Sequence, residues 1–146
     1  LFSGYWNAPE VNAHDFRGGW FHMGDLFVRR ADGSLDFVDR AKYLIKSGGE
    51  NIYPAEVERV LLAQPEVADA VVVRRRDERW GEVPAAFVAL QPGAGVTAEA
   101  LLSRCREQLA GYKVPKEIRF VELASFPRSS TGKIQRHEVE RQWLGI

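Results

Sequence analysis

The sequence predicts an α+β fold, with a small three-stranded sheet backed by helices and preceded by a β-hairpin. Two observations indicate this class. Short runs of valine, isoleucine, leucine and phenylalanine alternate with longer segments whose apolar residues recur at helical spacing. Near the start, Asp32 and Gly33 separate two apolar runs, and Asp-Gly in such a place is a strong hairpin signal. The 146 residues suffice for one domain with part of another.

The hairpin and the first helix can be placed from local residue types. We expect the two hairpin strands at residues 26–28 and 35–38, which are apolar apart from one aspartate. A helix is expected at residues 54–63, because a proline at the first helical position loses no hydrogen bond there. Two valines and a leucine of this segment recur at helical spacing, which predicts one apolar face.

The three strands of the sheet are expected at residues 70–73, 85–90 and 118–123. The first strand contains an unbroken run of three valines, which predicts burial on both faces of the sheet. Residues 74–76 are all arginine and stand beside two acidic residues, so we expect them in a solvated loop.

Two more helices complete the predicted fold. Thr97 can cap a helix with its hydroxyl, and the helix is expected to run to about Ala110, where Gly111 closes it. Cys105 recurs with leucines at helical spacing in this segment, which indicates a buried apolar side chain instead of a nucleophile. A final amphipathic helix is expected at residues 135–143.

Composition excludes several classes of function. Lys+Arg and Asp+Glu are both 20, so no bulk charge favours nucleic acid or an anionic membrane. A single cysteine excludes an internal disulfide and fits a reducing, cytoplasmic location. The three histidines show no metal-ligand spacing, and no apolar run approaches the roughly 20 residues that span a bilayer. Because the chain starts without methionine or a signal-like leader, we expect it to come from a longer protein.

The stretch from Asp39 to Glu58 combines four features of a ligand site. A strand end leads into a cationic corner at Arg40 and Lys42, then into a glycine pair at residues 48–49, then into a helix start. Glycines allow close backbone approach, and a helix N-terminus favours anions. The stretch therefore indicates a site for a phosphate-bearing ligand, although a glycine pair alone is usually only a turn.

This stretch closely resembles the hinge and glycine loop of the adenylate-forming superfamily, which includes acyl-CoA synthetases, aryl-CoA ligases, luciferases and peptide-synthetase adenylation domains. Two flanking motifs resemble the same family in the same order, Phe-His-Met-Gly-Asp at residues 21–25 and Phe-Pro-Arg-Ser-Ser-Thr-Gly-Lys-Ile at residues 126–134. The resemblance implies that residues 1–41 are the tail of a large N-terminal domain, including its last hairpin. Residues 42–146 are then the mobile C-terminal α+β domain.

The resemblance also implies the chemistry. Such enzymes join a carboxylic acid, here a fatty or aryl acid, to ATP as an acyl adenylate and release pyrophosphate. The small domain then rotates, and coenzyme A takes the acyl group as a thioester. The expected partners are the acid, ATP, coenzyme A and the chain's own N-terminal domain, with Mg²⁺ held mainly by that missing domain. We expect the 146-residue chain alone to be inactive.

Three residues carry the adenylation step by resemblance. Lys133, on a flexible Ser-Ser-Thr-Gly loop, would bridge the carboxylate and the phosphate as a point charge. Asp25 would accept hydrogen bonds from both ribose hydroxyls, and Arg40 would lie near the ribose and phosphate. The alternatives are a solvated lysine, a turn aspartate and a strand-end ion pair. Met23 departs from the family's usual threonine.

The hinge and the glycine loop concern the second step. Lys42 falls where the family has its hinge, which needs a side chain that remains in water in both positions. Gly48 and Gly49 resemble the loop that lines the pantetheine tunnel, where a side chain would block the thiol. Lys46 stands near that loop, where some relatives carry lysine and many do not.

Contacts to the nucleotide end of coenzyme A are expected from Trp80, Tyr112 and Lys113. Aromatic faces can stack on adenine, and a lysine can meet a phosphate. Val114 stands where some relatives have a phosphate-binding arginine, and simple packing is the alternative for Trp80.

Two alternatives to a coenzyme A ligase remain. One is an adenylation domain that serves a carrier protein, which would show a carrier sequence after Ile146. The other is a non-catalytic binding module that uses the same fold as a docking surface. Presence of Asp25, Arg40, Gly49 and Lys133 together argues against a module without catalysis.

Overall fold

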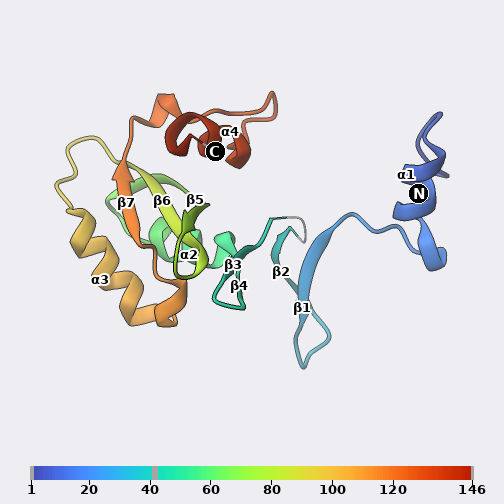
Figure 1. The fold of residues 1–146 in the computed structure, drawn as a ribbon, viewed down its shortest axis with the longest axis horizontal. Coiled ribbons are helices and arrows are strands. Elements are labelled where there is room, and N and C mark those ends of the chain that lie inside the picture. The colour runs from blue at the N-terminus through green and yellow to red at the C-terminus, as the bar shows by residue number, and fades with distance from the viewer. Residues whose placement is uncertain (1, 41–42, 146) are drawn as a thin grey trace. The chain divides into compact units, whose positions relative to one another are not determined.

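The computed structural model describes residues 2–40 and 43–145 and divides into two compact units (Figure 1). The first unit is Leu1–Lys42 and the second is Tyr43–Ile146. The expected domain boundary, between Ala41 and Lys42, lies outside the described residues.

The first unit contains the predicted hairpin. Strands β1 (Asp25–Arg29) and β2 (Leu35–Arg40) pair antiparallel, and the rings of Phe27 and Phe37 meet edge to face across them. They follow helix α1 (Pro9–Asp15) and a 3-10 turn, η1 (Arg17–Gly19). Helix α1 is not predicted from the sequence, because seven residues are too few for a recurring apolar face. Four aromatic rings of this unit contact one another: Phe2, Tyr5, Phe16 and Phe21.

The second unit is built on one sheet, which has five strands among the described residues instead of the three predicted. The central strand β6 pairs antiparallel with β5 along one edge. Along its other edge β6 pairs first with β3, antiparallel, and then with β7, parallel. The two unpredicted strands, β3 and β4, have only three residues each, which is too short for a recognisable alternation. The strands are β3 (Ile45–Ser47), β4 (Glu50–Ile52), β5 (Val67–Asp77), β6 (Gly81–Leu90) and β7 (Glu117–Phe120).

The arginine run is corrected by the structure, because residues 74–76 belong to β5 and not to a solvated loop. Each of the three has a register partner on β6. Arg75 also pairs with Glu117 on β7 at 2.6 Å, and Arg119 pairs with the same carboxylate. These guanidinium groups keep the pKa of Glu117 below its usual value, Arg119 contributing most. Pairing with β6, which no local pattern shows, therefore places these arginines in the strand.

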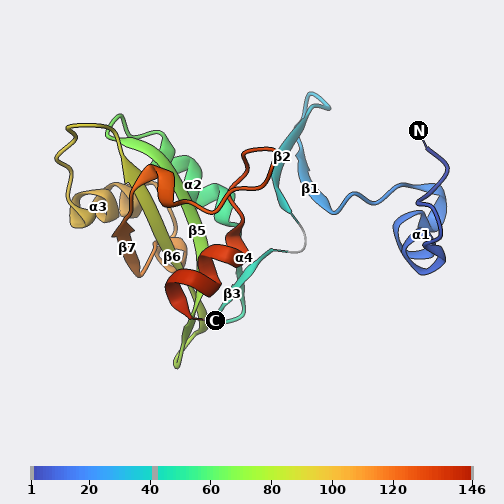
Figure 2. The same cartoon turned by 90° about the horizontal axis from the view of Figure 1, so that it is seen from above.

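The sheet is covered on both faces, as the valine run predicts. Val72 belongs to a core cluster with α2 (Pro54–Leu62) and α3 (Ala98–Gln108), while Val71 and Val73 belong to a second cluster. That second cluster includes residues of α4 (Arg136–Val139) and of the π turn η4 (Glu140–Leu144). In Figure 1, α3 lies below the sheet and α4 above it, and Figure 2 shows the same unit from above.

The helices begin as expected but end differently. Thr97 Oγ1 accepts a hydrogen bond from the Ala100 N–H at 3.2 Å, which confirms the predicted cap. Cys105 is fully buried in α3, and burial raises the pKa of its thiol, so it is a core side chain. Helix α3 ends at Gln108, and Gly111 begins the 3-10 turn η2 (Gly111–Lys113) instead of closing α3. A further 3-10 turn, η3 (Leu123–Ser125), follows β7.

A polar cluster ties the start of the second unit to its end. The Tyr43 hydroxyl donates to Glu140, a buried residue of η4, and the same carboxylate accepts from Arg74 Nε at 3.1 Å. Burial, and then the hydrogen bond to Glu140, raise the pKa of Tyr43 well above its ordinary value. Tyr43, the first described residue of this unit, is therefore held against both β5 and η4.

Candidate active site

A cavity of about 330 Å³ lies beside the glycine loop in the second unit. Three segments form it: the β3–β4 turn, the turn between β5 and β6, and the segment around η2. It brings together three predicted residues of the thiol and nucleotide site, Gly48, Trp80 and Tyr112. The full lining is Ser47, Gly48, Glu50, Trp80, Gly111, Tyr112 and Lys116.

Gly48 is the glycine that this cavity requires. Its φ is +58°, and a Cβ built on it would lie 2.7 Å from Cε3 of Trp80. Its N–H also donates to the Trp80 carbonyl at 2.9 Å, so the two turns are joined by backbone. Gly49 also has a positive φ, of +91°, but a Cβ there would meet nothing within 4 Å. Gly48 is therefore required by both conformation and close contact, and Gly49 by conformation alone.

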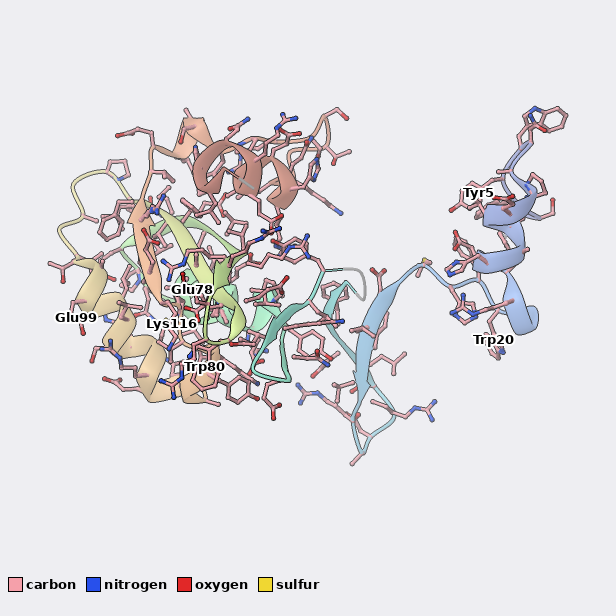
Figure 3. The ribbon with its side chains drawn as sticks, viewed as in Figure 1. Tyr5, Trp20, Glu78, Trp80, Glu99 and Lys116 are labelled. Carbon is pink, nitrogen blue, oxygen red and sulfur yellow. The ribbon has the colours of Figure 1, made fainter. Side chains whose placement is uncertain are left out.

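Trp80 forms one wall of the cavity and is held in place by its own turn. Asp77 accepts hydrogen bonds from the backbone N–H groups of Arg79, at 3.0 Å, and Trp80, at 2.9 Å. The Arg79 guanidinium lies 4.6 Å from the centre of the indole ring. Trp80 is 41% exposed and Tyr112 is 39% exposed, so both rings present free surface on which a planar group could stack. Figure 3 shows Trp80 close to Lys116 at this end of the unit.

The structure separates the two lysines of the η2 segment. Lys113 is not in the cavity lining, and its Nζ donates to both carboxylate oxygens of Glu56 on α2, each at 2.8 Å. This hydrogen bond raises the pKa of Lys113. Lys116, which the sequence analysis did not single out, lines the cavity, and its N–H donates to the Pro84 carbonyl at 2.9 Å. The only sequence feature that associates Lys116 with this site is its position three residues after Lys113.

Lys133 projects from a small hairpin that follows η3. Arg128 and Ile134 form an isolated antiparallel bridge at its base. At the tip, the Gly132 N–H donates to the Ser129 carbonyl at 2.9 Å, and the Ser129 N–H donates to the Lys133 carbonyl at 2.8 Å. Gly132 has a φ of +81°, which permits the tight turn. Lys133 is exposed and lines a second cavity, of about 350 Å³.

The predicted nucleotide residues lie in the first unit. Asp25 begins β1 and lines a cavity of about 580 Å³ with the neighbouring His22 and Met23. In the hairpin register Asp25 stands opposite Arg40. The side chain of Arg40, and the whole of the predicted hinge residue Lys42, lie outside the described residues.

Neither a metal cluster nor a membrane span is present in residues 2–40 and 43–145. These residues contain no group of three His, Cys, Asp or Glu side chains that could hold a metal ion. Within the same residues, no helix has the length and apolar character needed to cross a membrane.

Comparison with known proteins decides the family. The family described as the AMP-binding enzyme C-terminal domain matches residues 56–133, which is more than half of the chain. The chain belongs to this family. The match spans α2, the sheet from β5 to β7 and the Lys133 loop, so the resemblance seen in the motifs is confirmed.

Members of the family with curated functions match the chain over nearly its whole length. A 2-succinylbenzoate–CoA ligase from Geobacillus kaustophilus is 50% identical over 94% of this chain. A feruloyl-CoA synthase from Amycolatopsis is 45% identical over 98% of this chain. The chain spans only 28% and 29% of these two relatives.

Solved structures agree with the fold. The o-succinylbenzoate CoA synthetase from Bacillus subtilis, in complex with its acyl-adenylate intermediate, matches 96% of this chain with a TM-score of 0.89 and 40% identity. A fatty acyl CoA synthetase from Mycobacterium tuberculosis matches 99% with a TM-score of 0.73 and 39% identity. The chain covers 28% of each of these structures. The predicted α+β class is therefore confirmed.

Proposed function

We propose that this chain is the C-terminal part of an AMP-forming acyl- or aryl-CoA ligase. The complete enzyme would activate a carboxylic acid with ATP to an acyl adenylate, releasing pyrophosphate, and would then transfer the acyl group to coenzyme A, releasing AMP. The family match over residues 56–133, together with CoA ligases that align with 94–98% of the chain, supports this proposal most directly. Within that enzyme, residues 1–41 would be the last part of the large N-terminal domain, and residues 42–146 would form the mobile domain.

Lys133 is the proposed catalytic cation of the adenylation step. In that step a carboxylate oxygen attacks the α-phosphate, the bond to pyrophosphate breaks, and negative charge gathers on both reacting groups. An ammonium group at the tip of an exposed hairpin can reach both groups at once. Asp25 would hold the ribose hydroxyls of ATP, and Arg40 would contact the ribose and phosphate. The Mg²⁺ that accompanies ATP would be held mainly by the N-terminal domain.

The Gly48–Trp80 cavity is proposed to receive coenzyme A in the second step. Its two half-exposed aromatic rings can stack on the adenine, and Lys116 can donate to a phosphate oxygen. Gly48 lets the Trp80 ring lie directly against the β3–β4 turn, and Gly49 leaves free space beside the same turn, so that the turn would form a smooth wall for the pantetheine arm. Lys113, which is bound to Glu56, would hold the η2 segment of the cavity against α2. Lys42 would serve as the hinge between the two steps.

The test uses the full-length ligase and separates the two steps. Acid-dependent exchange of labelled pyrophosphate into ATP, measured over short, medium, long-chain and aromatic acids, reports adenylate formation. Consumption of the isolated adenylate by coenzyme A reports thioester formation. We expect one class of acid to support both reactions, and the 146-residue chain alone to support neither. Absence of exchange with every acid would overturn the proposal. If the acyl group were transferred only to the phosphopantetheine of a carrier protein, the acceptor in the proposal would be that carrier protein and not coenzyme A.

A further inference from the structure

One guanidinium group ties the tip of the Lys133 hairpin to the sheet. Arg128 Nη1 donates to the carbonyl of Gly132 at 2.9 Å, and Gly132 directly precedes Lys133. Arg128 Nη2 donates to Asp69 Oδ2 on β5 at 2.5 Å. A single planar side chain thus bridges the backbone beside Lys133 and a carboxylate 59 residues earlier in the chain.

Both ends of this bridge are themselves fixed. Asp69 Oδ1 accepts from the N–H of Ala70 at 2.9 Å, and Asp69 lies at the register shift where β5 pairs with β6. The Arg128 guanidinium lies 5.7 Å from the ring centre of Phe126, which is buried in the core. The bridge therefore joins a carboxylate that is fixed on the sheet to an arginine that lies against a buried ring of the core.

Apart from this bridge and the packing of Ile134 at its base against the core, the hairpin is held by bonds within itself. The Ser129 hydroxyl contacts Thr131 Oγ1 at 2.9 Å and accepts from the Lys133 N–H at 3.3 Å. Such bonds shape the turn, but they do not decide where the turn points relative to the sheet. Serine, threonine and glycine residues at the tip also leave the backbone many alternative conformations.

We propose that Asp69 and Arg128 are positioning residues for Lys133, which hold its hairpin in the orientation that adenylation requires. This inference rests on the proposed role of Lys133. A preorganised cation stabilises charge that develops in the transition state, and a displacement of about 1 Å can cost about 10²-fold in rate. The side chains of Arg128 and Asp69 are 36% and 24% exposed, and ion pairs as accessible as this contribute little to folding. Loss of the pair should therefore slow the reaction far more than it destabilises the fold.

The experiment compares four variants of the full-length ligase: Asp69→Asn, Arg128→Met, Lys133→Ala and the double variant Asp69→Asn/Lys133→Ala. We expect Asp69→Asn and Arg128→Met to slow single-turnover adenylation by about 10- to 100-fold. The thioester step, started from pre-made adenylate, should stay within about twofold of normal, since the proposed rotation has then carried the hairpin away. The double variant should be no slower than Lys133→Ala alone, because Asp69 acts through Lys133. Glu99→Gln, which breaks an exposed pair with Arg106 on α3, is the matched control and should change neither step.

Three outcomes would contradict this inference. Equal slowing of both steps would show a merely structural role for the pair. Additive losses in the double variant would show that Asp69 does not act through Lys133. Normal adenylation by Asp69→Asn beside slow adenylation by Lys133→Ala would overturn this inference alone, whereas normal adenylation by Lys133→Ala would overturn the proposed function of Lys133 and this inference with it.

Discussion

The Gly48–Trp80 cavity and the Lys133 hairpin are built in opposite ways within one unit. Three chain segments are joined around the cavity by backbone bonds, such as the one from Gly48 to the Trp80 carbonyl. The hairpin is closed on itself and is tied to the sheet through the Arg128–Asp69 pair. The shape of the cavity thus depends on backbone bonds between three segments, whereas the orientation of the hairpin depends on one side-chain pair. This contrast matches the two proposed tasks, since a ligand site depends on its shape, while a catalytic cation depends on the position of one charge.

The largest effect is expected from removing the charge on the hairpin. In the full-length ligase, Lys133→Ala should slow adenylate formation by about 10²–10³-fold, because one preorganised donor to the transition state is lost. The thioester step from pre-made adenylate should remain near normal. Lys133→Arg should restore the rate only in part, since a planar guanidinium differs in shape from an ammonium. Single-turnover assays of each step check this, and equal loss in both steps would mean that hairpin and cavity do not serve separate steps.

The shape of the cavity can be changed at one glycine and not at its neighbour. An alanine Cβ at Gly48 would press against the Trp80 ring, whereas one at Gly49 has free space. We expect the KM for coenzyme A to be about tenfold higher in Gly48→Ala than in Gly49→Ala, with the rate of adenylation unchanged in both variants. Gly49→Ala is the matched control because both positions have positive φ. Similar KM values for the two variants would show that contact with Trp80 does not shape the ligand site.

A smaller effect should distinguish the two lysines beside the cavity. Lys116→Ala should raise the KM for coenzyme A about three- to tenfold, through loss of a cation facing a phosphate. Lys113→Met should leave that KM within about twofold, since its ammonium is engaged by Glu56 outside the cavity. Steady-state kinetics with saturating acid and ATP measure both values. A larger KM change in Lys113→Met than in Lys116→Ala would reverse the assignment.

The smallest expected effect concerns stability. The Lys113–Glu56 pair is partly exposed, so Lys113→Met should lower the free energy of unfolding of the chain by about 0.2–1 kcal/mol. The pKa of Lys113 is raised in the folded protein, so its contribution is fully present below the unfolded pKa of about 10.4 and is lost as pH rises through the folded value. Denaturant unfolding at pH 8 and near pH 11 should therefore show a difference between wild type and variant that shrinks at the higher pH. A difference that grows with pH would contradict the pairing.

Local pattern was enough for much of the fold. The β1–β2 hairpin, the proline start of α2 and the threonine cap of α3 each depend on residues within a few positions of one another, so the sequence shows them directly. The valine run at residues 71–73 indicates burial on both faces for the same reason. The motifs at residues 21–25, 39–58 and 126–134 likewise carried the family resemblance, and the match over residues 56–133 confirms the family.

Tertiary structure alone decided the features that join distant segments. The arginines of β5 are in a strand because β6 pairs with all three of them, and Lys113 is bound to a carboxylate 57 residues away. The separate requirements at Gly48 and Gly49 depend on where the Trp80 ring lies in the fold. The Asp69–Arg128 bridge likewise joins β5 to the Lys133 hairpin. Composition, periodicity and motif spacing describe neighbours along the chain, whereas these contacts depend on which side chains the completed sheet brings together.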